Sequence, residues 1–177
     1  VESDPELRSS FIHVYDKVEP LPNRTRRDYR RWLVDSLYLE ILNRRLIEAE
    51  GDAENSFVGT NVVRKHLTRT LDAITYSIRV KEGKVDEALA ALFGELERVK
   101  RHGFLLNETL RAGKELVAAR ESVLVEADKA PSSTLAAELV RNYLEGEQVP
   151  DRELELAWVR EVVPAITLKE LGELAVE

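Results

Sequence analysis

The sequence predicts an α+β fold in which helices pack on one face of an antiparallel sheet. β-Branched and aromatic residues concentrate in residues 10–18, and residues 57–81 form the next extended region. Apolar residues recur at helical spacing from Thr25 to Glu50 and again, in several segments, from Val85 onward. The order of one strand, a long helix, two strands and several helices is typical of the α+β class.

Length and composition are those of a globular domain. The 177 residues include 26 Lys and Arg against 33 Asp and Glu, a net charge of −7, and 44% are hydrophobic. We expect residues 1–177 to form a single domain. No apolar run reaches the roughly 18 residues of a membrane span. The absence of Cys excludes disulfides, thiolate metal sites and a Cys nucleophile.

The charged residues are unevenly distributed. Residues 145–177 contain nine acidic and three basic residues, a balance of −6, whereas the rest of the chain is nearly neutral. Nucleic-acid binding requires a basic surface, so we expect no nucleic-acid partner. One basic cluster is a candidate contact for an acidic partner, above all through Arg24, Arg27 and Arg31, although a solvated first helical turn is the simpler interpretation. The cluster consists of Arg24, Arg26, Arg27, Arg30 and Arg31.

The second extended region divides into two strands that we expect to pair antiparallel. From Ile74 to Lys81 apolar and polar residues alternate with period two, which is typical of a strand with one buried and one polar face. The short break near Asp72 predicts that residues 57–71 run antiparallel beside this strand. The polar face is predicted to consist of Thr75, Ser77, Arg79 and Lys81.

Six helices are predicted from apolar periodicity and capping residues. The first begins at the cap Thr25 and is expected to stop at Gly51-Asp52, and the second ends at Gly103. The last opens with a T-x-x-E capping box at Thr167. The three helices between them are predicted to be capped by Asn107, to be capped within Pro131-Ser132-Ser133, and to start at Pro150-Asp151, respectively. Their apolar faces are predicted to be Leu110, Gly113, Leu116, Val117, Leu124 and Ala127; Leu135, Leu139, Val140 and Tyr143; and Leu154, Trp158 and Val162.

The sequence contains no self-contained active site. Its histidines, His13, His66 and His102, are too far apart to share a helix face, and H-x-x-E-H and H-E-x-x-H are both absent. We therefore expect each histidine to be a packed or surface side chain. Glycine-rich phosphate loops and the G-x-S-x-G nucleophile motif are absent as well. No catalytic or metal-binding residue is predicted in this chain.

One continuous stretch resembles a known family. Residues 86–104 read DEALAALFGELERVKRHGF and are followed by NETLRAGK at residues 107–114. Together they resemble the M16 zinc peptidases, the pitrilysin and insulinase group, in which a helix ends at a Gly-Phe pair and a second helix follows. Shorter pieces agree in their order along the chain. They are Asp4-Pro5-Glu6, the helix of residues 25–46, and Ile166-Thr167-Leu168-Lys169-Glu170-Leu171.

The resemblance implies a non-catalytic domain of the second type in a long M16 chain, with the α/β roll of that family. Catalytic M16 domains contain H-x-x-E-H and a distant Glu, which bind zinc and activate water. This sequence lacks these residues, so the resemblance implies that residues 1–177 are an inactive fragment of a zinc metallopeptidase. Zinc and an upstream catalytic domain are expected in the parent chain, and the closing strand of the sheet is expected beyond residue 177.

In such a protein the domain would help to wall a chamber that encloses peptide substrates. Arg79 and Lys81, on the polar strand face, are the candidate peptide contacts, although solvated surface positions explain them as well. Two other functions stay open: a non-enzymatic M16-like scaffold, or a stand-alone α+β adaptor that uses the Arg24–Arg31 cluster. The fragment could form a homodimer, and the bacterial periplasm and the cytoplasm are both plausible compartments.

Overall fold

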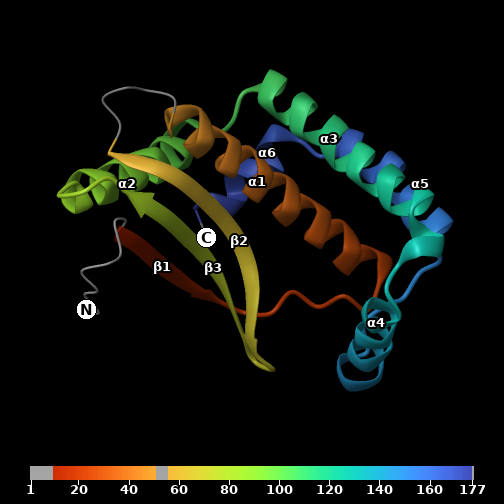
Figure 1. Ribbon diagram of the computed structural model, residues 1–177. Coiled ribbons are helices and arrows are strands. Elements are labelled where there is room, and N and C mark those ends of the chain that lie inside the picture. The colour runs from red at the N-terminus through yellow and green to blue at the C-terminus, as the bar shows by residue number, and fades with distance from the viewer. Residues whose placement is uncertain (1–9, 51–55, 177) are drawn as a thin grey trace. The chain divides into compact units, whose positions relative to one another are not determined.

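Figure 1 shows the computed structural model, which describes residues 10–50 and 56–176. Among these residues it contains a three-stranded sheet and six α-helices, which confirms the predicted α+β class. The Asp4-Pro5-Glu6 motif and the predicted helix stop at Gly51-Asp52 lie outside the described residues. The elements are β1 (Ser10–Val18), α1 (Arg26–Glu50), β2 (Phe57–Thr68), β3 (Leu71–Val80), α2 (Val85–His102), α3 (Leu106–Val125), α4 (Ser132–Glu145), α5 (Arg152–Val162) and α6 (Leu168–Leu174), with 3-10 turns η1 (Ala127–Lys129) and η2 (Val163–Ala165).

The chain forms two compact units, and α1 contributes about half of its length to each. The first unit contains the sheet, the part of α1 from Leu39 onward, and α2. The second unit contains the part of α1 up to Tyr38 together with α3, α4, α5 and α6. Each unit has buried apolar side chains of its own.

The sheet of the first unit is antiparallel, with β3 between β1 and β2. The predicted antiparallel pairing of the second and third strands is therefore confirmed. Their turn is at residues 69–70, slightly before the break predicted near Asp72. Asp72 instead lies within β3, where it is buried and its Oδ1 is 3.0 Å from His66 Nδ1. A buried carboxylate of this kind is tolerated because it is paired.

One face of this sheet is covered by α1 and α2. Asn43 of α1 fixes the helix against β2, because its amide accepts a hydrogen bond from the Val62 N–H and donates one to the Val62 carbonyl, both at 2.8 Å. Burial of apolar side chains between the helices and the sheet is the main stabilising contribution in such a layer pair. The almost fully buried side chains are Ile41, Leu42, Leu46, Phe57, Val62, Ile78, Val80, Leu92 and Val99.

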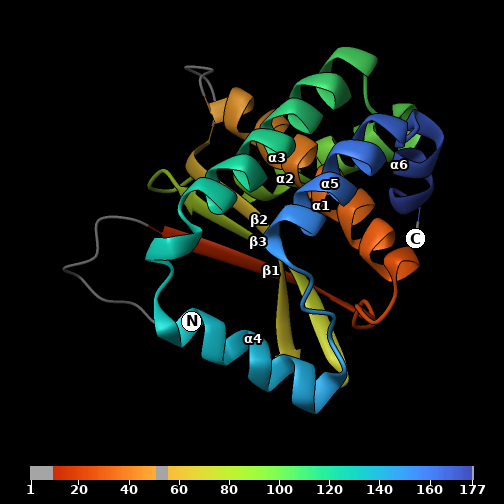
Figure 2. The ribbon, with the colours of Figure 1, turned by 90° about the vertical axis from the view of Figure 1, so that its right-hand side faces the viewer.

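In the second unit α3 and α5 pack side by side (Figure 2). α5 also contacts the first half of α1, where the rings of Tyr29 and Trp158 have their centroids 5.6 Å apart. Gly113 lets α3 approach the turn η2 closely, since a Cβ at this position would lie 3.1 Å from Val163 Cγ1. α6 is tied to α1 by the Arg30–Glu170 ion pair at 2.5 Å.

Two helices begin with the caps that the sequence predicts. The Asp28 N–H donates to Thr25 Oγ1 at 3.1 Å, and the Glu170 N–H donates to Thr167 Oγ1 at 3.3 Å. In both helices the carboxylate at the third position accepts a hydrogen bond from the backbone N–H of the capping residue. Each pair of bonds satisfies donors that the helix itself leaves without partners.

α4 and α5 begin where the sequence predicts, at Ser132 and directly after Asp151, but two predicted side-chain caps are wrong. α3 begins one residue before Asn107, because the Glu108 carboxylate accepts a hydrogen bond from the Leu105 N–H at 2.6 Å and ends the preceding loop there. α4 has Pro131 at its cap position, and Ser132-Ser133 lies in its first turn without a capping side-chain bond. The fixed backbone of Pro131, in place of a side chain, sets the start of this helix.

The apolar faces predicted for α3, α4 and α5 are only partly buried. In α3 the residue Gly113 is buried, but Leu110 is 55% exposed. In α5 the residue Val162 is buried, but Leu154 is 46% exposed. α4 buries none of its side chains, so its predicted core face is wrong. No described helix combines the length and the apolar content that crossing a membrane requires.

Candidate functional site

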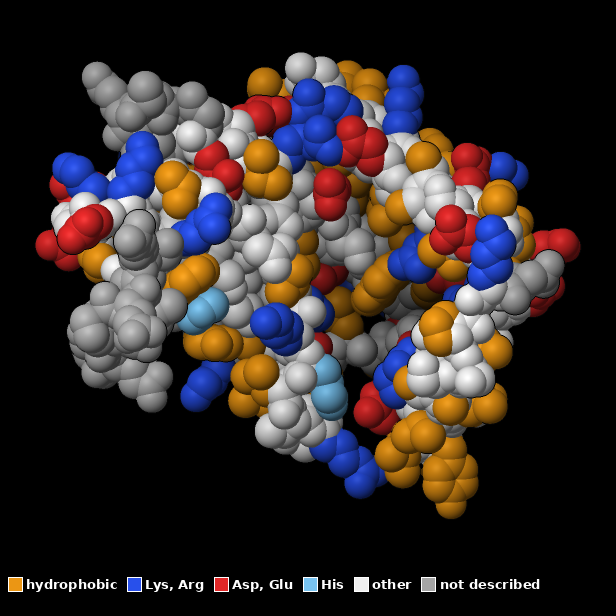
Figure 3. Space-filling model, viewed as in Figure 1, with side chains coloured by type: hydrophobic (Ala, Val, Ile, Leu, Met, Phe, Trp, Pro, Cys, Tyr) orange, Lys and Arg blue, Asp and Glu red, His pale blue; other side chains and the backbone are white. Residues whose placement is uncertain are grey.

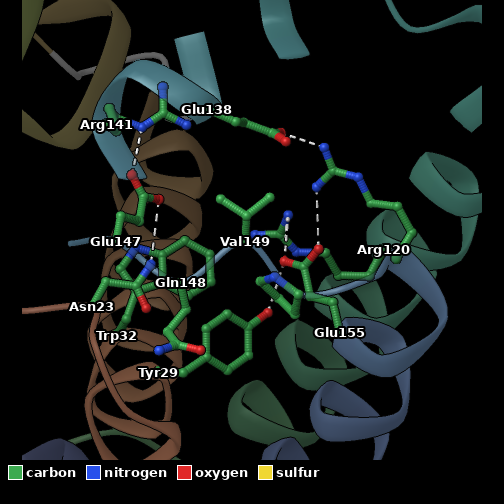
Figure 4. Close-up of a pocket in the computed structure, with 12 residues that line it drawn as sticks. Asn23, Tyr29, Trp32, Arg120, Glu138, Arg141, Glu147, Gln148, Val149 and Glu155 are labelled. Carbon is green, nitrogen blue, oxygen red and sulfur yellow. Dashed lines mark hydrogen bonds and ion pairs between the residues drawn. The ribbon is translucent and has the colours of Figure 1, made fainter. Parts of the chain in front are cut away.

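A polar pocket of about 240 Å³ lies within the second unit (Figure 4). It is bounded by the first turns of α1, by α3, by α4 and by the start of α5, and the segment between α4 and α5 completes its wall. Gln148 fixes this segment beside the residues that precede α1: its N–H donates to the Asn23 carbonyl at 2.7 Å, and its amide donates to the Arg24 carbonyl at 2.6 Å. Three arginines, three glutamates and two aromatic rings face the pocket.

Glu155, in the first turn of α5, has the most partners of the pocket carboxylates. It is buried, accepts hydrogen bonds from the Tyr29 hydroxyl at 2.9 Å and from Arg152 Nη1 at 3.3 Å, and lies 3.5 Å from Arg120 Nη1. Burial and the negative charge of Glu155 raise the pKa of Tyr29 above its usual range. Tyr29 is therefore a neutral hydrogen-bond donor at neutral pH.

The other two pocket carboxylates are held in the same way. Glu138 of α4 accepts a hydrogen bond from Arg152, which raises the pKa of that guanidinium. Glu147 accepts hydrogen bonds from Arg141 Nε at 2.6 Å and from Asn23 Nδ2 at 3.3 Å. Each glutamate thus has an arginine beside it, and the pocket carries balanced charge.

Arg120 is attached to the pocket mainly through an aromatic ring. Its Cζ lies 5.0 Å from the centroid of the Trp32 ring, a cation–π geometry, and the Tyr29 ring stacks on Trp32 at 5.6 Å. Its contact with Glu155 at 3.5 Å is an ion pair at the limit of hydrogen-bond distance. The aromatic rings therefore position a guanidinium that keeps N–H groups available to the pocket.

The pocket lacks the groups that peptide hydrolysis needs. Each glutamate is bound to an arginine, which makes it unsuitable as a general base, and no Ser, Cys or Thr lines the pocket. Across residues 10–50 and 56–176, no three His, Asp or Glu side chains are grouped as metal ligands. His66 is engaged by Asp72, and His13 Nδ1 lies 3.0 Å from Ser77 Oγ. These donor sets do not fit zinc, and the paired polar groups of the pocket are arranged to bind or brace.

The two candidate peptide contacts lie at one end of β3. The exposed Arg79 side chain is on the sheet face that α1 and α2 leave uncovered, and its Nη2 donates to the Val58 carbonyl at 3.2 Å. Gly59 lies opposite it, and a Cβ there would be 3.6 Å from the Arg79 side chain. Lys81 follows the end of β3 and is half-buried, with its N–H donating to the Ser56 carbonyl at 2.9 Å. Arg79 therefore lies on the expected strand face, whereas Lys81 lies just outside the strand.

The uncovered sheet face is a mixture of aromatic and polar side chains. β1 contributes Phe11 and Tyr15, which are 58% and 51% exposed, with His13 between them. Thr75 on the same face is fully buried, and its hydroxyl has no hydrogen-bond partner among the described residues. The predicted polar face of this strand is therefore not evenly exposed, because the centre of the middle strand is enclosed.

The basic cluster does not act as one surface patch. Arg24 Nε donates to the carbonyl of the last residue of α4 at 3.0 Å. Arg26 and Arg30 pair with glutamates of α5 and α6. Arg27 and Arg31 are exposed on α1. Three of the five arginines thus contact other helices of the second unit, although Arg24 and Arg26 are also exposed to solvent.

The sequence alone does not reveal the pocket. Tyr29 and Glu155, which share its central hydrogen bond, are 126 positions apart. The visible signals are the pairs Tyr29/Trp32 and Arg152/Glu155, each three residues apart and thus on one helix face. Such pairs are also common on solvated helices, so they predict a pocket only when their distant partners are known.

Comparison with known proteins finds similar structures but no similar family model or curated sequence. No family model and no curated protein matches the chain. The first half of the periplasmic protease PqqL from Escherichia coli matches with a TM-score of 0.86 at 17% identity, over 97% of this chain and 37% of that one. A Yersinia pestis protein assigned to the insulinase family of proteases matches with a TM-score of 0.77 at 10% identity. This match covers 98% of this chain and 37% of the Yersinia chain. The chain has the fold of an M16 peptidase domain.

The M16 resemblance found in the sequence is therefore confirmed at the level of the fold. The chain spans only 37% of the PqqL half and 19% of the complete PqqL structure. A further structure with the M16 fold is described as the inactive peptidase domain of an inferred zinc protease from Bordetella parapertussis. It matches with a TM-score of 0.60 and 16% identity, over 97% of this chain and 88% of that one.

Proposed function

We propose that this chain is a non-catalytic domain of an M16-type zinc metalloendopeptidase, and that it helps to form the peptide-binding chamber beside an H-x-x-E-H domain. The observation that carries the proposal is the match to PqqL over 97% of the chain at a TM-score of 0.86. The sequence supplies the other half of the argument, because an M16 fold without H-x-x-E-H lacks the ligands of the catalytic zinc. The zinc would be held by the companion domain.

The uncovered sheet face supports a role in contacting peptides. It combines the exposed rings of Phe11 and Tyr15 with the guanidinium of Arg79. Aromatic rings bind apolar side chains, and a guanidinium binds carbonyl and carboxylate oxygens, so the face can contact both parts of a peptide. We therefore keep Arg79 as the main candidate for substrate contact, with Lys81 beside it.

The test of this function pairs the chain with the H-x-x-E-H domain of the same parent protein. We expect zinc-dependent cleavage of a quenched fluorescent peptide only when both domains are present. Arg79→Glu should raise KM more than it lowers kcat, because the residue acts through binding. Lys100→Glu, an equal change of charge at an exposed position of α2, is the control. Full activity of the zinc domain without this chain would contradict the proposal.

A second candidate function is a non-enzymatic scaffold with the M16 fold. The observation in its favour is the match to the inactive peptidase domain from Bordetella parapertussis, which this chain covers to 88%. This candidate predicts a parent protein whose other M16-type domain also lacks an intact H-x-x-E-H. No pairing of its domains would then cleave peptide in the presence of zinc.

A further inference from the structure

The apolar side of α4 faces outward. Leu135, Leu139 and Tyr143 follow one another at intervals of one helical turn, and Val140 lies beside them. Their exposed fractions are 48%, 63%, 88% and 55%. Figure 3 shows hydrophobic side chains gathered over α4, at the lower right. No residue of α4 is buried, whereas the shorter α5 buries four.

The polar side of α4 attaches it to the rest of the second unit. Glu138 pairs with Arg152, and Arg141 Nε donates to the Glu147 carboxylate at 2.6 Å. Asn142 Nδ2 donates to the Glu147 carbonyl, also at 2.6 Å. In Figure 4 both Glu138 and Arg141 point from α4 toward the pocket. Rotating α4 to bury its apolar side would break these contacts, so the pocket network keeps that side outward.

An apolar helix side that is exposed over four large side chains marks an interaction surface. Most of the stability of a short helix comes from packing of its apolar face, which α4 does not obtain within its own unit. A membrane is a poor partner, because interfacial helices have a polar side rich in Lys and Arg. Residues 131–155 contain six acidic and two basic residues, a balance of −4, which anionic lipids would repel. The surroundings of α4 therefore favour a protein partner.

We infer that the apolar side of α4 docks into an apolar groove, bordered by lysine and arginine side chains, on the zinc-bearing companion domain. This inference rests on the function proposed above. Two observations select this occupant. The balance of −4 around α4 favours a partner surface that carries lysine and arginine side chains. The chain also spans only 37% and 19% of the PqqL structures, so its fold occurs there within a much longer polypeptide.

Charge substitutions on the two sides of α4 test the inference. Leu139→Glu places a carboxylate in the middle of the apolar side, and Thr134→Glu adds the same charge at an exposed position on the polar side. The whole chain is titrated into the separately expressed zinc domain in a calorimeter, and both variants are also made in the parent protein. We expect Leu139→Glu to weaken association by about tenfold or more, and Thr134→Glu by less than about twofold. Unchanged thermal melting of both variants alone shows that they fold.

The possible outcomes separate the docking surface from the proposed function. Equal affinity of Leu139→Glu and the original chain for an active zinc domain would overturn the docking surface and leave the proposed function intact. A parent protein without a zinc domain would overturn the proposed function and the inference with it. A dimer that Leu139→Glu dissociates in light scattering would assign the surface to a second copy. Binding to vesicles of phosphatidylcholine and phosphatidylserine would assign it to a membrane, and either result contradicts the inference.

Discussion

At the scale of single residues, Glu155 determines whether the polar groups of the pocket are satisfied. Glu155→Ala would leave the Tyr29 hydroxyl and the guanidinium groups of Arg120 and Arg152 without their shared acceptor. Removing one member of a buried pair costs about 3–5 kcal/mol. Because both arginine side chains keep access to solvent, we expect a loss of about 2–3 kcal/mol in the free energy of unfolding.

Urea unfolding followed by circular dichroism measures this loss. Glu153→Ala, at an exposed position two residues earlier in the same helix, is the matched control and should change stability by less than about 0.5 kcal/mol. If Glu155→Ala and Glu153→Ala lower the free energy of unfolding by the same small amount, the pocket network does not stabilise the second unit.

The ion pair between Arg30 and Glu170 gives the chain a pH-dependent stability. The hydrogen bond from Arg30 lowers the pKa of Glu170 from 4.5 to about 2, and hydrogen bonds from the Thr167 N–H and hydroxyl add to this effect. A carboxyl whose pKa is lower in the folded state stabilises the protein above its unfolded pKa. That contribution is lost as the pH falls from about 4.5 to about 2.

Comparison of Glu170→Gln with the original chain isolates this contribution. We expect the variant to be less stable than the original chain by about 1–2 kcal/mol at pH 7. This estimate allows for the solvent exposure of Arg30, which weakens the ion pair. The difference in stability should vanish toward pH 2. Urea midpoints at several pH values measure it. Glu173→Gln, whose exposed carboxylate is 3.7 Å from Lys169, should follow the original chain at every pH. A difference that stays constant with pH would exclude the ion pair as its source.

At the scale of helices, two glycines distinguish a close contact from an open surface. A Cβ at Gly113 of α3 would lie 3.1 Å from Val163 Cγ1, whereas a Cβ at Gly94 of α2 would have no described atom within 4 Å. Gly113→Val should therefore lower the free energy of unfolding by about 1–3 kcal/mol through overpacking. Gly94→Ala should raise it by about 0.5–1 kcal/mol, because alanine restricts the unfolded chain.

Chemical denaturation of Gly113→Val and Gly94→Ala measures whether the free energy of unfolding falls in the first variant and rises in the second. Gly113→Ala is the intermediate case, because its single methyl group requires Val163 to move by only a few tenths of an ångström. A Gly113→Val variant as stable as the original chain would mean that Val163 does not restrict the space at this position.

The sequence predicts the ends of helices better than it predicts their surroundings. The caps at Thr25 and Thr167 and the end of α2 at His102 depend on local chemistry, and the structure confirms them. The apolar side of α4 is also present as predicted, but it is exposed. Periodicity identifies an apolar side and does not determine what covers it. Pocket residues such as Glu155 are brought together by tertiary contacts, which a single sequence does not contain.

At the scale of the whole molecule, the fold persists at 17% identity with PqqL. A layer architecture of this kind is specified by the order of strands and helices and by apolar periodicity, which many different sequences can supply. The order of motif pieces along this chain was sufficient to indicate the same fold. The position of the candidate peptide contact Arg79 was predictable because strand alternation assigns each residue to a face.

The distribution of histidines over the whole molecule leads to the last prediction. His13, His66 and His102 belong to three different elements, and His66 is paired with Asp72. We therefore expect the purified chain, after dialysis against zinc, to retain no stoichiometric metal and to melt at an unchanged temperature, because a ligand stabilises only the state that binds it. The zinc domain of the parent protein, treated identically, is the control that should retain metal and melt higher. One zinc ion per chain together with a raised melting temperature would contradict the non-catalytic assignment, and His13→Ala and His66→Ala would then identify the ligands.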